Sequence, residues 1–353
     1  SGNIPSEIGQ LTNLEGLGFT HNQLSGVIPP EISNLTNLTD LTLGVNQFRG
    51  TIPKEIGQLT NLMYLTLNGN QLSGTIIPEI GQLINLTYLD IAGNQLTGAI
   101  PAEIGQLKKL SWLSLQVNQL SGPIPKEFGQ LTNLSYSCLS YNQLSGNIPT
   151  EIGQLTNLTA LGLNDNQLSG IIPPEISLLS NLQYFLIHNN FIEDIPALRN
   201  VSTQLSCSNN RLTFEDFERN LDQIGKSGLS FDYSPQRLFG QEYHTTAVEG
   251  KTFTLNIPCG GTNNHYQWFK DGILLPASPD ASELTLPAIQ FTDAGSYHIT
   301  VTNDSVPNLV LTSFPVQVSV EEPCIKRDSL ALVALYNATD GPNWTHKDNW
   351  LTG

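Results

Sequence analysis

Basic residues are scarce in this sequence. Among 353 residues, 15 Lys and Arg stand against 31 Asp and Glu, which gives a formal net charge of −16. Nucleic acids and anionic membrane surfaces attract proteins through clusters of basic side chains. The composition therefore argues against nucleic acid and against anionic membrane surfaces as binding partners.

Long apolar runs are also missing. The longest near-candidate, Leu330 to Tyr336, is far shorter than the stretch of about 20 residues that spans a bilayer as a helix. We therefore expect no membrane span in this segment. No signal peptide precedes the first repeat, and Ser1-Gly2 matches the end of a repeat, so we expect the chain to be part of a longer protein.

The residues that carry catalysis or bind metals are few and scattered. The four cysteines and six histidines show no metal-ligand spacing. The sequence has no Gly-x-Ser-x-Gly elbow, no phosphate-binding glycine loop, and no nucleophile with a base nearby in sequence. We therefore predict a protein that is not an enzyme, with no metal and no cofactor.

A period of 24 residues runs through the first half of the chain. Asparagine marks it at nine positions, the last after a shorter step: Asn22, Asn46, Asn70, Asn94, Asn118, Asn142, Asn166, Asn190 and Asn210. A strict period of this length indicates one small structural unit stacked many times. Such a stack has a long exposed face and no enclosed cavity, which favours binding over catalysis.

Each unit begins with a short strand pattern. In Leu89-Asp90-Ile91 the apolar residues alternate, as in a strand with one buried face. The asparagine that follows turns the chain, and we expect its side-chain amide to pair with backbone groups inside the turn. One unit departs from the pattern, because Ser137 occupies a core position that is otherwise apolar.

The repeat resembles the leucine-rich repeat, in particular the plant-type subclass with its Leu-Ser-Gly-x-Ile-Pro segment, as at Leu120 to Pro125. The resemblance covers residues 1 to about 210. It implies an α/β repeat solenoid, a right-handed superhelix whose parallel sheet lines the concave side. Residues 212–217 read as a short helix that closes the solenoid, with Thr213 at its N-cap and Asp216 three residues on. We assign residues 1–225 to this domain.

From about Phe231 the period stops, and the pattern becomes that of an all-β immunoglobulin-like sandwich over residues 226–322. Trp268 occupies the place of the core tryptophan, and Tyr297 that of the tyrosine corner. Ile299 stands where that family has its second bridging cysteine, so the inter-sheet disulfide is absent.

Residues 323–353 resemble the amino-terminal cap of bacterial leucine-rich repeat surface proteins, an apolar helix followed by two tryptophans. The cap residues are Leu330, Val333, Leu335, Tyr336, Trp344 and Trp350. One interpretation is that the chain is a window of a longer tandem array. The other is that this cap covers the first coil of the next subunit, which would build an open head-to-tail filament.

An aromatic column is predicted on the concave face, where the residue before the second core leucine of each unit points outward. Four adjacent aromatics form a stripe, and polar residues flank it. The candidate ligand-binding residues are Tyr64, Tyr88, Trp112, Tyr136, Tyr184, Asp90, Asn68, Gln116 and His188. Aromatic rings beside amide and hydroxyl groups suit a protein, peptide or glycan partner; alternatively, the tyrosines only pack on one another and order the sheet.

A second periodic set is a glutamate in each unit, from Glu7 to Glu175. These could form a cation-binding stripe, but a glutamate at the start of a helical turn also complements the helix dipole, and we favour that interpretation. We predict an extracellular or cell-surface protein with a non-enzymatic binding or adhesion role. The alternative is a structural filament subunit with head-to-tail self-association.

Overall fold

The computed structural model describes residues 1–339. The chain forms two compact units. The first comprises Ser1–Arg237 with two short segments, Gly260–Thr262 and Asp304–Leu309, and the second takes the remaining residues from Leu238 on. Each unit is described separately below.

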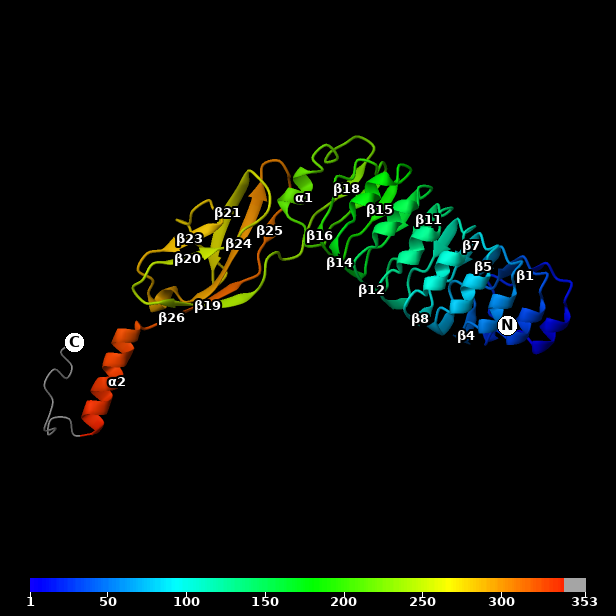
Figure 1. Cartoon of the computed structure of the whole chain (residues 1–353), viewed down its shortest axis with the longest axis horizontal. Coiled ribbons are helices and arrows are strands. Elements are labelled where there is room, and N and C mark those ends of the chain that lie inside the picture. Colours follow the sequence, from blue (N-terminus) through cyan, green and yellow to red (C-terminus); the bar gives the residue numbers. More distant parts are fainter. Residues whose placement is uncertain (340–353) are drawn as a thin grey trace. The chain divides into compact units, whose positions relative to one another are not determined.

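A parallel sheet of ten strands runs the length of the first unit, one strand from each coil (Figure 1). Equivalent residues of successive repeats lie side by side, so Tyr64 pairs with Tyr88 and Tyr88 with Trp112. The strands are β1 (Gly16–Gly18), β3 (Asp40–Thr42), β5 (Tyr64–Thr66), β7 (Tyr88–Asp90), β9 (Trp112–Ser114), β11 (Tyr136–Cys138), β13 (Ala160–Gly162), β15 (Tyr184–Leu186), β17 (Gln204–Ser206) and β18 (Ser230–Asp232). This confirms the predicted parallel-sheet solenoid.

The tenth strand, β18, lies beyond residue 225, where the sequence placed the end of the solenoid. It pairs in parallel with β17, and Phe231 lies opposite the core residue Leu205. No repeat asparagine follows it, so the 24-residue pattern gives no signal for this strand.

A second parallel sheet of eight strands forms from the segment after each repeat asparagine, which the sequence did not predict. Its strands are β2 (Ser25–Gly26), β4 (Gln47–Thr51), β6 (Gln71–Thr75), β8 (Gln95–Gly98), β10 (Gln119–Gly122), β12 (Gln143–Gly146), β14 (Gln167–Ile171) and β16 (Phe191–Asp194). Each of the first seven contains the repeat glycine, which adopts a positive φ, for example 77° at Gly122. Glycine weakens an isolated strand but permits this backbone, so pairing between coils determines the sheet.

The helical layer consists of 3₁₀ turns, so the α-helical part of the predicted α/β class is wrong for the repeats. These turns are η1 (Ser6–Gln10), η2 (Pro30–Asn34), η3 (Lys54–Gln58), η4 (Pro78–Gln82), η5 (Ala102–Gln106), η6 (Lys126–Gln130), η7 (Thr150–Gln154) and η8 (Pro174–Leu178). A Cβ on Gly105 would lie 2.5 Å from the carbonyl oxygen of Glu127, so the turns pack too closely for a side chain there. Each repeat glutamate lies in the first turn of its helix, as expected.

Between these layers lies a continuous column of leucine and isoleucine side chains. Leu89, Leu113 and Leu161 from the first sheet are at most 1% exposed. The repeat asparagines join successive coils, and Asn166 is typical: its Oδ1 accepts the Leu144 N–H at 3.0 Å, and its Nδ2 donates to the carbonyl oxygens of Leu139 (3.1 Å) and Leu163 (3.0 Å). The predicted pairing of these amides with the backbone is confirmed.

Helix α1 (Phe214–Glu218) follows the last repeat of the solenoid. The Thr213 backbone N–H donates to Asp216 Oδ2 at 2.8 Å, and the capping box expected from the sequence is present. Phe214 and Phe217 are fully buried, and Asp216 also accepts the backbone N–H of Ile195 at 3.2 Å. The helix therefore covers apolar side chains at this end of the repeats.

The second unit contains a mixed six-stranded sheet and a two-stranded sheet. The larger sheet comprises β19 (Tyr243–Val248), β21 (Asn264–Lys270), β22 (Ile273–Leu274), β24 (Gly295–Asn303), β25 (Leu311–Thr312) and β26 (Val316–Glu321), and the smaller one β20 (Phe253–Asn256) and β23 (Glu283–Leu286). Strands β19 and β26 pair in parallel, whereas the other pairs are antiparallel. A 3₁₀ turn, η9 (Phe291–Asp293), precedes β24.

The core of this unit is built around Trp268 and Tyr297. Trp268 is fully buried and its Nε1 donates to the Ala281 carbonyl oxygen at 2.9 Å. The Tyr297 hydroxyl donates to the carbonyl oxygen of Asp293, four residues upstream, at 2.7 Å. Ile299 is fully buried at the position where the immunoglobulin pattern has its second bridging cysteine, so an apolar side chain fills that place.

Helix α2 (Cys324–Ala338) contains four of the predicted cap residues. Leu330, Val333 and Leu335 are exposed by 55%, 38% and 50%, and Tyr336 is half-buried. Trp344 and Trp350 lie outside the described residues. Within residues 1–339, no helix combines the length and apolarity needed to cross a bilayer.

Candidate functional site

The predicted aromatic column forms a row of neighbouring rings on the outer face of the ten-stranded sheet, the face that points away from the leucine core. Ring centroids are 6.1 Å apart for Tyr64 and Tyr88, 5.5 Å for Tyr88 and Trp112, and 3.7 Å for Trp112 and Tyr136. The rings of the last two pairs are almost parallel, with interplanar angles of 10° and 8°, whereas those of Tyr64 and Tyr88 are tilted by 30°. We call these four residues the aromatic stripe. They are exposed or half-buried, so the edges of the rings reach solvent.

The surface of the stripe is mostly apolar ring, and its polar groups are the tyrosine hydroxyls and the Trp112 indole N–H. Burial, together with the neighbouring Cys138, raises the pKa of Tyr136 to about 12, so its phenol is protonated at neutral pH. Burial, and then Asp90, also raises the pKa of Tyr88. The Trp112 Nε1–H is buried and has no hydrogen-bond partner in the described part of the chain.

The flanking polar residues lie where the sequence placed them. Asp90 Oδ1 accepts the Ala92 N–H at 3.1 Å, and burial raises the pKa of this carboxyl group. Gln116 Oε1 accepts a hydrogen bond from Cys138 Sγ at 2.9 Å. The Asn68 amide lies over Gly44, where a Cβ would approach its Oδ1 to 2.2 Å.

Tyr184 does not belong to the stack, because Ala160 interrupts the column. Tyr136 pairs with Ala160, and Ala160 pairs with Tyr184, so one ring position is vacant between the two tyrosines. The vacancy is a hollow of about 390 Å³, lined by Tyr136, Ser137, Cys138, Thr159, Ala160, Leu161, Gly162, Tyr184 and Leu186. We call it the Ala160 hollow.

The hollow was not predicted from the sequence, although two small residues in the sequence indicate it. Strand β13 is the only one of the ten that presents alanine followed by glycine at its two outward positions, Ala160 and Gly162. Two small residues on one strand between tyrosine-bearing neighbours leave space on a face that is otherwise filled.

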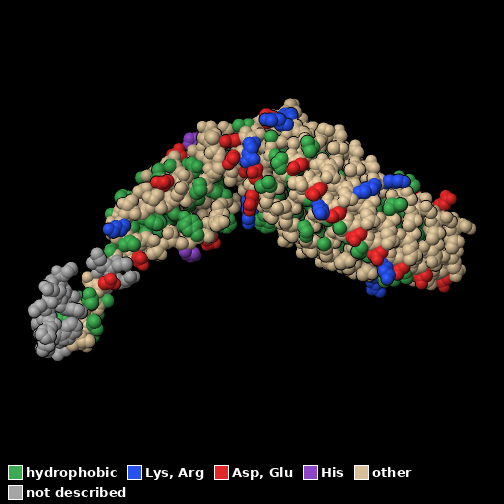
Figure 2. All heavy atoms as spheres, in the orientation of Figure 1, with side chains coloured by type: hydrophobic (Ala, Val, Ile, Leu, Met, Phe, Trp, Pro, Cys, Tyr) green, Lys and Arg blue, Asp and Glu red, His purple; other side chains and the backbone are tan. Residues whose placement is uncertain are grey.

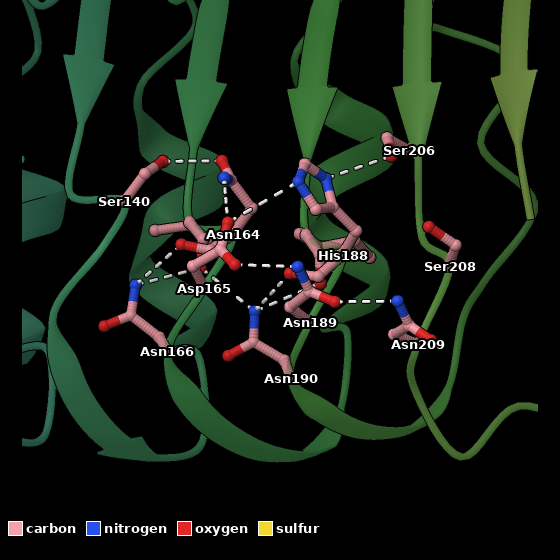
Figure 3. A network of polar contacts seen from close by, with 12 residues as sticks. Ser140, Asn164, Asp165, Asn166, His188, Asn189, Asn190, Ser206, Ser208 and Asn209 are labelled. Atoms are coloured by element: carbon pink, nitrogen blue, oxygen red, sulfur yellow. Dashed lines mark hydrogen bonds and ion pairs between the residues drawn. The ribbon is translucent and has the colours of Figure 1, made fainter. Parts of the chain in front are cut away.

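His188 lies in a polar network at the carboxyl ends of the strands (Figure 3). Its Nδ1 lies 3.0 Å from Ser206 Oγ, and its Nε2 lies 3.6 Å from Asp165 Oδ2. Asp165 also accepts from Asn189 Nδ2 at 2.7 Å, and Asn189 Oδ1 accepts from Asn209 Nδ2 at 2.8 Å. The network therefore links three successive coils.

A histidine between a serine and an aspartate invites comparison with a catalytic triad, but the hydrogen bonds here differ. The Ser206 hydroxyl donates to Asp232 Oδ2 at 2.8 Å, so its proton is directed away from the imidazole. Ser206 is also only 3% exposed, which leaves no approach for a substrate carbonyl. Nucleophilic catalysis requires the base to accept the proton of an accessible hydroxyl. The arrangement orders the strand ends instead.

The outer face of the ten strands carries negative charge. Their outward positions include Asp40, Asp90 and Asp232 and contain no Lys or Arg. Figure 2 shows that charged side chains are scattered over the visible surface of the first unit, with uncharged polar and backbone atoms between them. The aromatic stripe is therefore a local apolar feature on a mildly acidic face.

The geometry defines a class of protein: a repeat solenoid with a continuous parallel sheet and an open face. The chain belongs to the leucine-rich repeat proteins. The leucine rich repeat family models match residues 60–120, 13–35 and 157–179. No curated protein matches the chain at significant similarity.

Solved structures of plant proteins share this fold. The plant peptide hormone receptor RGFR1 in complex with RGF2 is 36% identical, with a TM-score of 0.60 over 69% of this chain and 39% of that one. The Arabidopsis receptor kinase HAESA, in complex with the peptide hormone IDA and the co-receptor SERK1, is 32% identical, with a TM-score of 0.60 over 69% and 41%. A plant ice-binding protein is 32% identical, with a TM-score of 0.54 over 60% and 70%. The chain thus spans about two fifths of the length of the two receptors.

Proposed function

We propose that this protein is a non-enzymatic binding module that holds a peptide or a protein segment along the outer face of its ten-stranded sheet. The observation that carries the proposal is the aromatic stripe, in which four neighbouring rings from adjacent coils, three of them stacked, are exposed or half-buried. Two similar structures are receptors in complex with peptide hormones, which supports a peptide over a glycan. By the same similarity, we propose an extracellular or cell-surface location.

The stripe suits this task because its rings are already ordered. Tyrosine and tryptophan offer a large contact area, and side chains that are fixed before binding lose little conformational entropy when a partner arrives. The amide and carboxylate groups of Asn68, Asp90 and Gln116 beside the rings can orient a peptide backbone by hydrogen bonds.

The test is a selection of random 12-residue peptides on the immobilised chain, followed by measurement on a variant with Tyr88→Ala, Trp112→Ala and Tyr136→Ala. We expect the selected peptides to bind this stripe variant at least about tenfold more weakly, because each ring contributes buried area and stacking. Affinity is measured by fluorescence anisotropy, and circular dichroism verifies that the variant is folded.

The matched control replaces Gln95, Gln119 and Gln143 with alanine. These three side chains are exposed, belong to the same repeats and lie on the eight-stranded sheet. Equal affinity of wild type and control is expected. Peptides that bind the stripe variant as tightly as wild type would refute the proposal.

We further propose that the second unit is an immunoglobulin-like domain acting as a spacer. Its support is the buried Trp268 and the Tyr297 hydroxyl bonded to a backbone carbonyl upstream, both features of that fold. Adhesion to another cell and a place among bacterial surface proteins rest on the resemblance of residues 323–353 and remain predictions.

A second candidate function is a filament subunit, favoured by the exposed apolar side chains of α2. In this alternative, Leu330, Val333 and Leu335 pack against the first coil of another copy, and assembly is head-to-tail. Light scattering after size exclusion is expected to show mass rising with concentration, and truncation after Glu322 to abolish the rise. A constant monomer mass of the whole chain at all concentrations would exclude this alternative.

A further inference from the structure

The Ala160 hollow is a second feature of the binding face, beside the stripe. Its walls are Tyr136 on one side and Tyr184 on the other, and its floor is the strand Ala160–Gly162. A Cβ on Gly162 would meet Cys138 Sγ at 3.1 Å and Ser140 Oγ at 2.9 Å, so these two side chains already lean over the floor.

The hollow has room for one aromatic ring between Tyr136 and Tyr184. Adjacent strands are about 4.8 Å apart, so Tyr136 and Tyr184 belong to strands roughly 10 Å apart. Two aromatic rings with one more stacked between them need about 7 Å between the outer planes, since stacked contacts are about 3.5 Å. An aliphatic side chain also enters such a space, but only a flat ring continues the stack that runs from Tyr88 to Tyr136.

Charge restricts the occupant further. Asp90 and Asp232 each lie three strands away from Ala160 in the sheet order, on opposite sides, which is roughly 14 Å. An extended peptide advances about 3.3 Å per residue, so four residues cover nearly the same length. Because the outward positions of the ten strands contain no Lys or Arg, a cationic peptide is favoured electrostatically.

We propose that the Ala160 hollow receives an aromatic side chain of an extended peptide, with basic residues about four positions before and after it that face Asp90 and Asp232. This proposal deepens the proposed function and rests on it. The aromatic side chain fills the gap that Ala160 leaves between Tyr136 and Tyr184, and the two carboxylates set the register of the peptide.

The probe is a fluorescently labelled nine-residue peptide with tryptophan at its centre, lysine at both ends and serine elsewhere. We expect it to bind the full chain, and to bind about tenfold more weakly when leucine replaces the tryptophan or when glutamate replaces both lysines. In the protein, Ala160→Trp fills the hollow with an aromatic side chain, as the neighbouring coils carry at Tyr136 and Tyr184, and is expected to weaken binding by about tenfold or more. Ala160→Ser leaves the hollow open and is the matched control.

The outcomes separate the two proposals. If wild type and Ala160→Trp bind the probe equally, or the leucine peptide binds as well as the tryptophan peptide, the hollow proposal is wrong. If that happens while the stripe variant still loses its library-selected peptides, the proposed function stands; if the stripe variant keeps them, both fall. Binding of cellohexaose that Ala160→Trp abolishes, with no binding of any peptide, would assign the hollow to a carbohydrate and overturn the proposal.

Discussion

Replacing Asn166 with leucine is expected to lower the free energy of unfolding of the solenoid by roughly 3 kcal/mol or more. The side chain is 7% exposed, and it satisfies the Leu144 N–H and the carbonyl oxygens of Leu139 and Leu163. Leucine has nearly the same volume but pairs with none of them. Each backbone group left buried without a partner costs about 1–3 kcal/mol, so three such groups outweigh the added apolar surface.

The measurement is urea unfolding followed by far-ultraviolet circular dichroism, together with hydrogen exchange at the Leu144 amide, which should lose its protection. Asn157→Ala is the matched control in the same repeat. Asn157 is exposed and makes one hydrogen bond, from its Nδ2 to the Thr132 carbonyl oxygen at 2.9 Å, so its loss should cost about 1 kcal/mol or less. Similar losses for both variants would show that the buried amides are not what couples the coils.

The second large effect has the opposite sign: Ser137→Leu is expected to stabilise the solenoid by about 2.5–6 kcal/mol. Ser137 is fully buried in the column that holds Leu113 and Leu161, and its Oγ has no hydrogen-bond partner in the described part of the chain. The substitution removes an unpaired hydroxyl, worth about 1–3 kcal/mol, and buries a leucine side chain, worth about 1.5–3 kcal/mol. A higher urea midpoint with an unchanged slope would report this gain.

The expected gain assumes that a leucine side chain fits at position 137, and Phe128 provides the test of this assumption. It is fully buried and stands where neighbouring repeats carry Ile104 and Ile152. If its larger ring already fills the space left by Ser137, the single substitution would overpack the core and destabilise the protein. Ser137→Leu combined with Phe128→Ile would then restore stability, and the prediction for the single variant would be wrong.

Much of the first unit could be predicted from the sequence, because the repeat period imposes its own register. Once equivalent positions must stack, Leu89 and Leu113 share the core side and Tyr88 and Trp112 share the outer side, as the strand pairing shows. The repeat asparagine was predictable for the same reason: only a side chain with both a donor and an acceptor can pair with backbone N–H and C=O groups of its own coil and of the preceding one.

The features that escaped prediction arise from contacts between coils or from departures from the repeat. The eight-stranded sheet contains glycine in most of its strands, so its local pattern does not indicate a strand, and only the neighbouring coil provides the pairing. Strand β18 has no repeat asparagine after it. The Ala160 hollow exists because Ala160 and Gly162 lack what their neighbours have, and a consensus records what repeats share.

The mismatch between the spacing of the coils and the rise of an extended peptide has a broader consequence. The face presents equivalent side chains about every 4.8 Å, whereas an extended partner places residues about every 3.3 Å, so the two scales match closely at about every second coil and third peptide residue, and less closely at about every third coil and fourth residue. Side chains between these matching positions are out of step with the coils, so the matching positions determine the register of the peptide. Substitutions at the matching positions would therefore change which partner binds, whereas substitutions at the intervening positions of either chain would have little effect.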